Sequence, residues 1–139
     1  MHRTTNVRTR PALSRPRRIV ALLAPSSLRA AAWALLALRR ARHDLAARGL
    51  EGVWVASPPR LPASARIGVL AVVRRKPSTC LERALVLQRW EADHGLPSDV
   101  VIGVRGASDA FRAHAWLDGM PDAGPLAFHE ILRLPAPPR

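Results

Sequence analysis

The chain has 139 residues, of which 22 are basic and 10 are acidic, giving a formal net charge of +12. This length is enough for one domain with a modest core and an appended segment, but not for two full domains. The single cysteine excludes an internal disulfide framework and any metal site built from several cysteines, and it fits a reducing compartment.

The positive charge is concentrated at the front of the chain. Residues 1–50 contain eleven arginines and one acidic residue, whereas residues 51–139 contain eleven basic and nine acidic residues. Such a front end suits nucleic acid, anionic lipid, an acidic protein or peptide, or simply a solvated tail. Basic composition alone supplies mainly non-specific affinity for nucleic acid, and the chain has no tyrosine for base stacking, so we expect no nucleic-acid partner.

The first elements in chain order are a tail and a helix. Residues 1–18 are arginine-rich and interrupted by prolines, and we expect them to be disordered. The apolar spacing in residues 27–48 predicts a helix, with Ser26 or Ser27 as the N-cap and Gly49 as the stop. Its apolar stretch is far shorter than the ~20 residues that span a bilayer. We therefore expect a cytoplasmic protein and leave contact with a membrane surface open.

The middle of the chain contains short elements. "GVWVAS", residues 52–57, is a strand candidate, and the proline-rich residues 57–66 must form a loop. "IGVLAVVRR", residues 67–75, indicates a helix, with a strand as the alternative. The predicted division is a basic tail over 1–18, a helical extension with a proline-rich linker over 19–66, and one further domain over 67–139.

The second half begins with a well-defined helix. Thr79 followed three residues later by Glu82 is a capping box, which predicts a helix from Cys80 to about His94. Three strands are predicted after it, in residues 99–105, 110–119 and 126–135. Within the second strand, Arg112, His114, Trp116 and Asp118 share one face. Helices followed by strands predict an α+β domain.

A cysteine at the first position of a helix has chemical consequences, although a lone cysteine is more often a small buried apolar residue. The unpaired backbone N–H groups around Cys80 favour a negative sulfur and can also stabilise an oxyanion formed when that sulfur attacks a carbonyl. A proton carrier is needed as well. His114 is the strongest candidate, because it is central in a strand between small alanines. His2 lies in the tail, and His43 and His94 lie near helix ends, where we expect them to be exposed.

The segments "CLERALVLQRW", "DVVIGVR", "FRAHAWLDG" and "LRLP" resemble the transglutaminase-like peptidases of lasso-peptide biosynthesis, the B proteins that remove the leader from a precursor peptide. The resemblance covers roughly Ile67 to Pro135. It implies a papain-like fold in which a helix bearing Cys80 packs on an antiparallel sheet bearing His114. It also implies that residues 67–139 are the catalytic domain, with Cys80 as the nucleophile and His114 as the general base and acid. Three roles stay open for Trp116: shielding the site, packing under the peptide, or plain packing within the strand.

The third catalytic residue is not fixed by this resemblance. The family places a carboxylate on the strand after the histidine, often twelve positions on, but Leu126 occupies that position here. Glu130 is the first candidate, at a spacing that resembles transglutaminases at large, and Asp122 in the turn is the second. Asp118 is the third, because four extended residues put its backbone about 13 Å from that of His114.

The resemblance also implies partners. Residues 1–56 offer one helix and one short strand, too little for the winged-helix domain that some leader peptidases carry. We therefore expect a separate leader-recognition protein, a precursor peptide and a lasso cyclase as partners. No cofactor and no metal are expected. Two other interpretations stay open: acyl transfer to an amine, as in true transglutaminases, and a non-enzymatic basic scaffold that binds nucleic acid or a protein partner.

Overall fold

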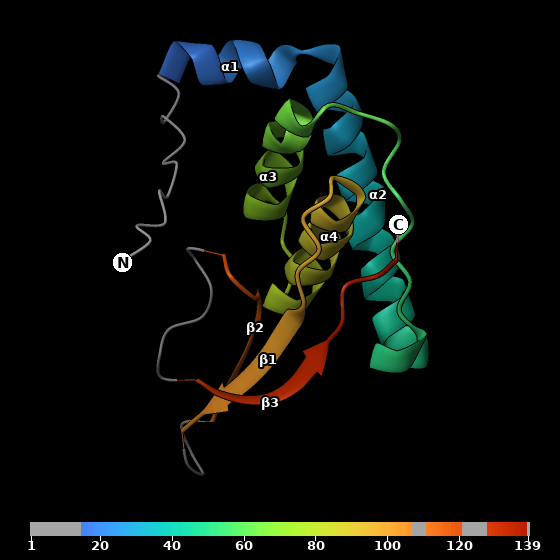
Figure 1. The fold of residues 1–139 in the computed structure, drawn as a ribbon, viewed down its shortest axis with the longest axis vertical. Coiled ribbons are helices and arrows are strands. Elements are labelled where there is room, and N and C mark those ends of the chain that lie inside the picture. Colours follow the sequence, from blue (N-terminus) through green and yellow to red (C-terminus); the bar gives the residue numbers. More distant parts are fainter. Residues whose placement is uncertain (1–14, 107–110, 121–127, 139) are drawn as a thin grey trace, which may run out of the picture.

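The computed structural model describes residues 15–106, 111–120 and 128–138. In these residues, four α-helices precede an antiparallel sheet of three strands (Figure 1). The predicted α+β architecture is therefore confirmed. The elements are α1 (Arg15–Leu23), α2 (Pro25–Arg48), α3 (Arg66–Arg75), α4 (Cys80–Asp93), β1 (Val100–Arg105), β2 (Arg112–Leu117) and β3 (His129–Leu134), with short 3-10 turns at Leu50–Gly52 and Ala63–Ala65.

The structure corrects the predicted start of the helical region. Helix α1 begins at Arg15, inside the segment predicted to be a disordered tail, while residues 1–14 lie outside the described residues. Proline is tolerated in the first turn of a helix, because its missing N–H would have no partner there. Helix α2 likewise begins at Pro25, so neither serine acts as its cap, and Ser27 is buried within the helix. Gly49 ends α2 as predicted, with a φ of 70° and its N–H donated to the Leu45 carbonyl.

The strand predicted for residues 52–57 is wrong. After the turn at Leu50–Gly52, the chain runs on without strand pairing. Trp54 is 60% exposed, whereas Val53 and Val55 are half-buried against the core. This segment is therefore a loop that packs Val53 and Val55 onto the domain and leaves Trp54 exposed.

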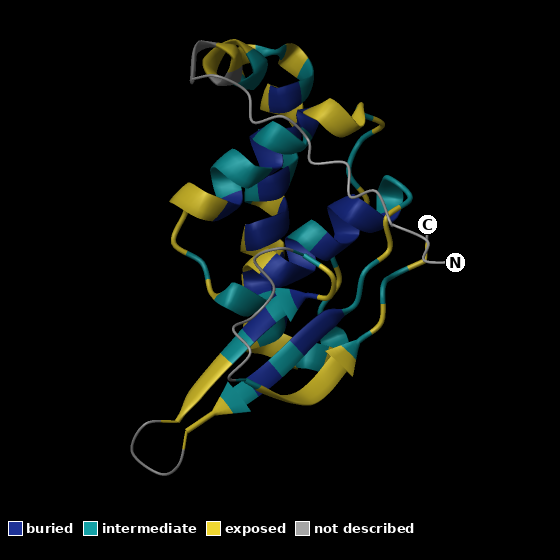
Figure 2. Ribbon diagram, turned by 60° about the vertical axis from the view of Figure 1, so that its left-hand side comes forward, coloured by how far each residue is buried: buried dark blue, intermediate teal, exposed yellow. Residues whose placement is uncertain are grey.

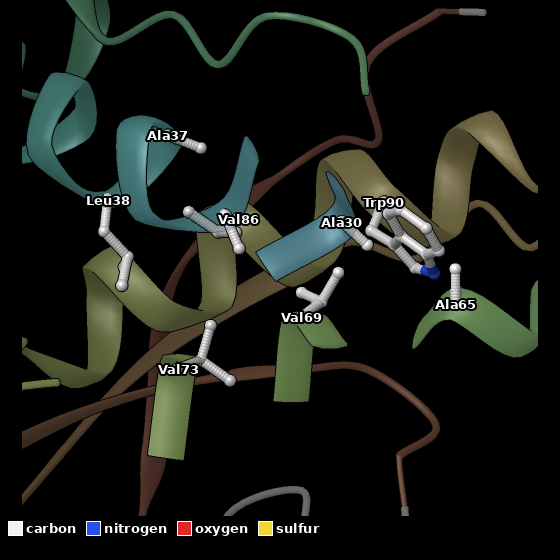
Figure 3. Close-up of a cluster of buried hydrophobic side chains, with 9 residues drawn as sticks. Ala30, Ala37, Leu38, Ala65, Val69, Val73, Val86 and Trp90 are labelled. Atoms are coloured by element: carbon white, nitrogen blue, oxygen red, sulfur yellow. The ribbon is translucent and has the colours of Figure 1, made fainter. Parts of the chain in front are cut away.

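The larger part of the core lies where α2, α3 and α4 meet (Figure 3). Trp90 of α4 is its largest fully buried side chain, and Val69 of α3 is also fully buried. Helices α2 and α3 cross very closely at Gly68, where an added Cβ would come within 2.0 Å of the Ser27 carbonyl oxygen. Helix α2 thus shares one core with the two helices that follow it. The buried members of this cluster are Ala30, Ala34, Ala37, Leu38, Ala65, Val69, Val73, Val86 and Trp90.

The sheet packs one face against α4 and has the strand order β2-β1-β3, so β2 is an edge strand. Ala115 and Leu117 of β2 share a second cluster with Ala84 and Leu85 of α4. Because side chains alternate along a strand, His114 and Trp116 point to the opposite face of the sheet, together as predicted. The ends of β1 and β2 nearest residues 107–110 are exposed (Figure 2).

Two buried polar side chains of α4 fasten the end of the chain to this helix. The Gln88 amide donates to the carbonyls of Leu134 and Pro135, at 3.0 and 3.2 Å. The Arg89 guanidinium donates to the carbonyl of Pro138 at 3.0 Å and is paired with Asp93. The segment after β3 is therefore held against the same helix that begins with Cys80.

Candidate active site

Cys80 is the first residue of α4, directly after a complete capping box. The Thr79 hydroxyl accepts the backbone N–H of Glu82 at 3.2 Å, and the Glu82 carboxylate accepts the N–H of Thr79 at 3.1 Å. The predicted helix start is confirmed. Cys80 itself is half-buried, and its sulfur lies at the positive end of the helix.

A long-range ion pair holds this helix start in place. The Arg42 guanidinium of α2 donates to both carboxylate oxygens of Glu82 at 3.2 Å, and also to the Pro77 carbonyl at 2.5 Å. The carboxylate raises the pKa of Arg42 above its ordinary value, chiefly through the hydrogen bond. This ion pair was not predicted from the sequence, because the two residues lie forty positions apart in the chain.

A cavity of about 420 Å³ lies between α3, α4 and β2. Cys80 and His114 both line it, and so does Trp116. Four consecutive β2 residues contribute to the wall, so the cavity runs along the outer edge of that strand. The structure thus brings the predicted nucleophile, the predicted base and the predicted substrate contact to one cavity. Its other lining residues are Arg66, Leu70, Val73, Arg74, Arg83, Ala84, Leu87, Ala115, Leu117 and Met120.

The imidazole of His114 lies among aromatic rings. Its centroid is 5.9 Å from that of Trp116, in a stacked arrangement, and 5.4 Å from that of Phe128, in a tilted one. Its strand face is opposite to that of Ala115, which packs on α4. Cys80 and His114 both line the cavity, and no hydrogen bond joins them among the described residues. Catalytic hydrogen bonds commonly tighten only when substrate is bound.

The three candidates for the third catalytic residue fall in different places. Asp122 lies outside the described residues, as does Leu126. Glu130 pairs with the same β1 residue as His114, namely Gly103, which puts the two backbones two strand spacings or about 10 Å apart. The carboxylates of Glu130 and Asp118 both bind the Arg133 guanidinium, at 2.8 and 2.5 Å.

Arg133 also favours the ionised form of both carboxylates. Its hydrogen bonds are the main cause that lowers the pKa of Asp118 and of Glu130 below their ordinary values, and the pair raises the pKa of Arg133 in turn. Neither carboxylate contacts His114 in this arrangement, so the identity of the third member stays a prediction. The pairing of Arg133 with these two carboxylates was not predicted from the sequence, because it depends on strands and turns that come together only in the folded chain.

One histidine differs from its prediction. His94, expected to be exposed at the end of α4, is half-buried, and its ring stacks on Trp90 with centroids 4.1 Å apart. Its two ring nitrogens lie 2.8 Å from the Trp90 carbonyl and 3.0 Å from the Leu61 carbonyl. His94 therefore joins the loop before α3 to α4. His43 and His129 are exposed, and His2 lies outside the described residues.

Comparison with known proteins gives one family. A family model described as the transglutaminase-like superfamily matches residues 26–125, which run from the start of α2 to beyond β2. No curated protein and no solved structure gives a significant match. In the part of the chain that the structure describes, no helix has both the length and the hydrophobicity to cross a membrane, and no cluster of side chains has the makeup of a metal site.

Proposed function

The chain belongs to the transglutaminase-like superfamily, whose members are generally cysteine peptidases or acyltransferases, and from this premise we propose that it is a cysteine peptidase acting on a ribosomally made precursor peptide. The observation that carries the proposal is that Cys80 at the start of α4 and His114 on β2 line the same cavity. The two side chains come from the two kinds of element, a helix start and a strand, that the family resemblance assigned to them.

The proposed reaction has two steps. In the first, His114 takes the proton of the Cys80 thiol and the sulfur attacks the peptide carbonyl, while the backbone N–H groups at the start of α4 bind the developing oxyanion. The C–N bond then breaks, and His114 gives its proton to the leaving amine. In the second step, His114 takes a proton from water and the hydroxide attacks the acyl-enzyme. The C–S bond then breaks, and His114 gives its proton to the leaving sulfur of Cys80, which releases the acid product. Hydrolysis therefore returns both residues to their starting state.

The finer assignment is removal of the leader from a lasso-peptide precursor. It is supported by the joint occurrence of "CLER" at a helix start and "AHAW" on a strand. Under this assignment a separate leader-recognition protein and a cyclase act with the chain, and both remain partners to be sought. The basic segment ahead of α2 is the natural place for such a partner or for an acidic leader, since residues 1–43 contain no acidic residue.

Co-expression of the precursor and partner proteins tests the proposal. With the wild-type chain we expect a precursor shortened by the length of its leader, and with Cys80→Ala or His114→Ala we expect the intact precursor. Soluble expression and an unchanged unfolding midpoint show that the variants fold. Normal processing by either variant overturns the proposal, and a cross-linked adduct in place of a shortened peptide identifies acyl transfer instead.

The same assay ranks the third-member candidates. Glu130→Gln, Asp122→Asn and Asp118→Asn each remove one carboxylate charge with little change in size. The variant that reduces processing without lowering stability identifies the residue that orients His114, because such a residue acts through the imidazole rather than on the substrate.

A further inference from the structure

The cavity beside Cys80 combines an apolar wall with positive charge. Leucine, valine, alanine and methionine side chains from α3, α4 and β2 form most of its lining, and three arginines, Arg66, Arg74 and Arg83, complete it. None of the described residues that line it carries a carboxylate. A cavity of this composition is suited to an aliphatic side chain that is accompanied by a negative charge.

The three arginines are not equivalent. Arg66 forms an ion pair with the buried Glu91, and its guanidinium also lies 3.8 Å from the Met120 sulfur, so its charge is balanced within the protein. Among the described residues, Arg83 donates only to neutral groups, the hydroxyl and the carbonyl of Ser78, at 2.8 and 2.9 Å. Its positive charge is therefore not neutralised by these bonds.

Arg74 lies on the other side of the cavity, in the last turn of α3. It is exposed, and none of the ion pairs formed between described residues includes Arg74 or Arg83. Arg83 stands three residues after Cys80, on the same side of α4. Two cations that have no ion-pair partner among the described residues, one from α3 and one from α4, thus flank the cavity that Cys80 lines.

We infer that this cavity selects a peptide segment that places an aliphatic side chain against the wall and an adjacent carboxylate side chain against Arg74 and Arg83. The inference rests on the proposed function, since it names the substrate that the Cys80 cavity accepts. An acidic residue gains attraction from both guanidiniums, and a lysine at the same position meets repulsion. Specificity then comes from both the attraction of the acidic residue and the repulsion of the lysine.

Thiol-directed peptide probes test the inference without knowledge of the precursor. Three acetylated dipeptidyl acyloxymethyl ketones carry leucine next to the ketone and either glutamate, glutamine or lysine before it. The sulfur of Cys80 displaces the acyloxy group, which leaves as a carboxylate, and a stable thioether remains. The measured quantity is the second-order rate of Cys80 labelling on the full chain, followed by intact mass.

For the wild-type chain we expect the order glutamate, glutamine, lysine, with glutamate about fivefold faster than lysine, as two exposed charge interactions allow. The ratio should fall towards one in about 0.5 M salt, because exposed charges are screened. Arg74→Glu should bring the three rates close together, because the new carboxylate offsets the remaining positive charge of Arg83. Arg75→Glu is the matched control, because the neighbouring Arg75 is also exposed but lines a different groove, against α1, and should leave the order unchanged.

Labelling with iodoacetamide distinguishes a failure of the charge selection from a failure of the proposed function. If iodoacetamide fails to modify Cys80 in the folded chain, the sulfur is not accessible and the proposed function is wrong. If iodoacetamide reacts but the glutamate and lysine probes react at equal rates, or not at all, the charge selection is wrong and the proposed function stands. If Arg74→Glu slows all three probes equally, the arginine acts on the sulfur rather than on the substrate, which also overturns the inference.

Discussion

The indole of Trp116 lies against the backbone of Gly103: a Cβ added at position 103 would come within 2.8 Å of Cη2 and 3.0 Å of Cζ3 of that ring. The same indole stacks on the imidazole of His114. Gly103 pairs with His114 across the β1–β2 ladder. The absence of a side chain at position 103 of β1 therefore makes room for the indole that stacks on the imidazole.

Replacement of Gly103 by alanine should displace the indole and with it His114. We expect Gly103→Ala to lower kcat/KM for precursor cleavage at least about tenfold, because small misplacements of a catalytic group are costly. The matched variant is Gly103→Ala combined with Trp116→Phe, whose smaller ring frees the space and should recover part of the loss. Unchanged cleavage by Gly103→Ala alone would show that the stacking does not position His114.

The capping box should make a measurable contribution to stability. Thr79→Ala removes the hydroxyl that accepts the Glu82 N–H, and we expect it to lower the free energy of unfolding by about 1 kcal/mol. Thr79→Ser keeps the acceptor and should retain most of that free energy. Chemical denaturation of the three proteins measures the difference, and equal stability of the alanine and serine variants would contradict the assigned cap.

Gly68 should be intolerant of any side chain. Its added Cβ would lie 2.0 Å from the Ser27 carbonyl oxygen and 3.2 Å from the Ala31 nitrogen, both backbone atoms of α2. We therefore expect Gly68→Ala to lower the free energy of unfolding by roughly 1–3 kcal/mol, the range for overpacked cores, despite the better helix propensity of alanine. A stability equal to or above that of the wild type, measured by denaturant, would show that α2 and α3 do not cross so closely.

The Arg133 cluster should give a pH-dependent contribution to stability. Arg133 lowers the folded-state pKa of Asp118 and Glu130, so its contribution is present above their unfolded values and is lost as pH falls through the folded ones. We expect Arg133→Gln to be less stable than the wild type near neutral pH, with a difference that shrinks below about pH 4. Denaturation across this range measures it. A difference that grows in acid would contradict the pairing.

The features that sequence predicted correctly are those set by neighbours in the chain. Thr79 and Glu82 are three residues apart, so the start of α4 and the position of Cys80 follow from local hydrogen bonding. The β-branched run of β1 and the alternation of β2 similarly identify strands and faces. The α+β order of elements, and the positions of Cys80 at a helix start and His114 on a strand, could thus be predicted from the sequence.

The features that sequence missed depend on contacts between distant residues. The ion pair between Arg42 and Glu82 joins residues that are forty positions apart. Arg133 binds the carboxylates of Asp118 and Glu130, two residues that the sequence offered as alternative candidates for one catalytic role. The loop after α2 was predicted as a strand. Its Val53 and Val55 pack on a core made of residues that are distant in the sequence, so this packing cannot be told from that of a strand in the sequence alone.

Mass analysis of an acid-quenched reaction tests the central claim most directly. The chain, its partners and the precursor are mixed, quenched during turnover and digested, and the peptide containing Cys80 is weighed. We expect that peptide to carry the mass of the leader fragment as a thioester in the wild type, with no adduct and no cleavage in Cys80→Ser. Cleavage of the precursor by Cys80→Ser at the wild-type rate would contradict the account.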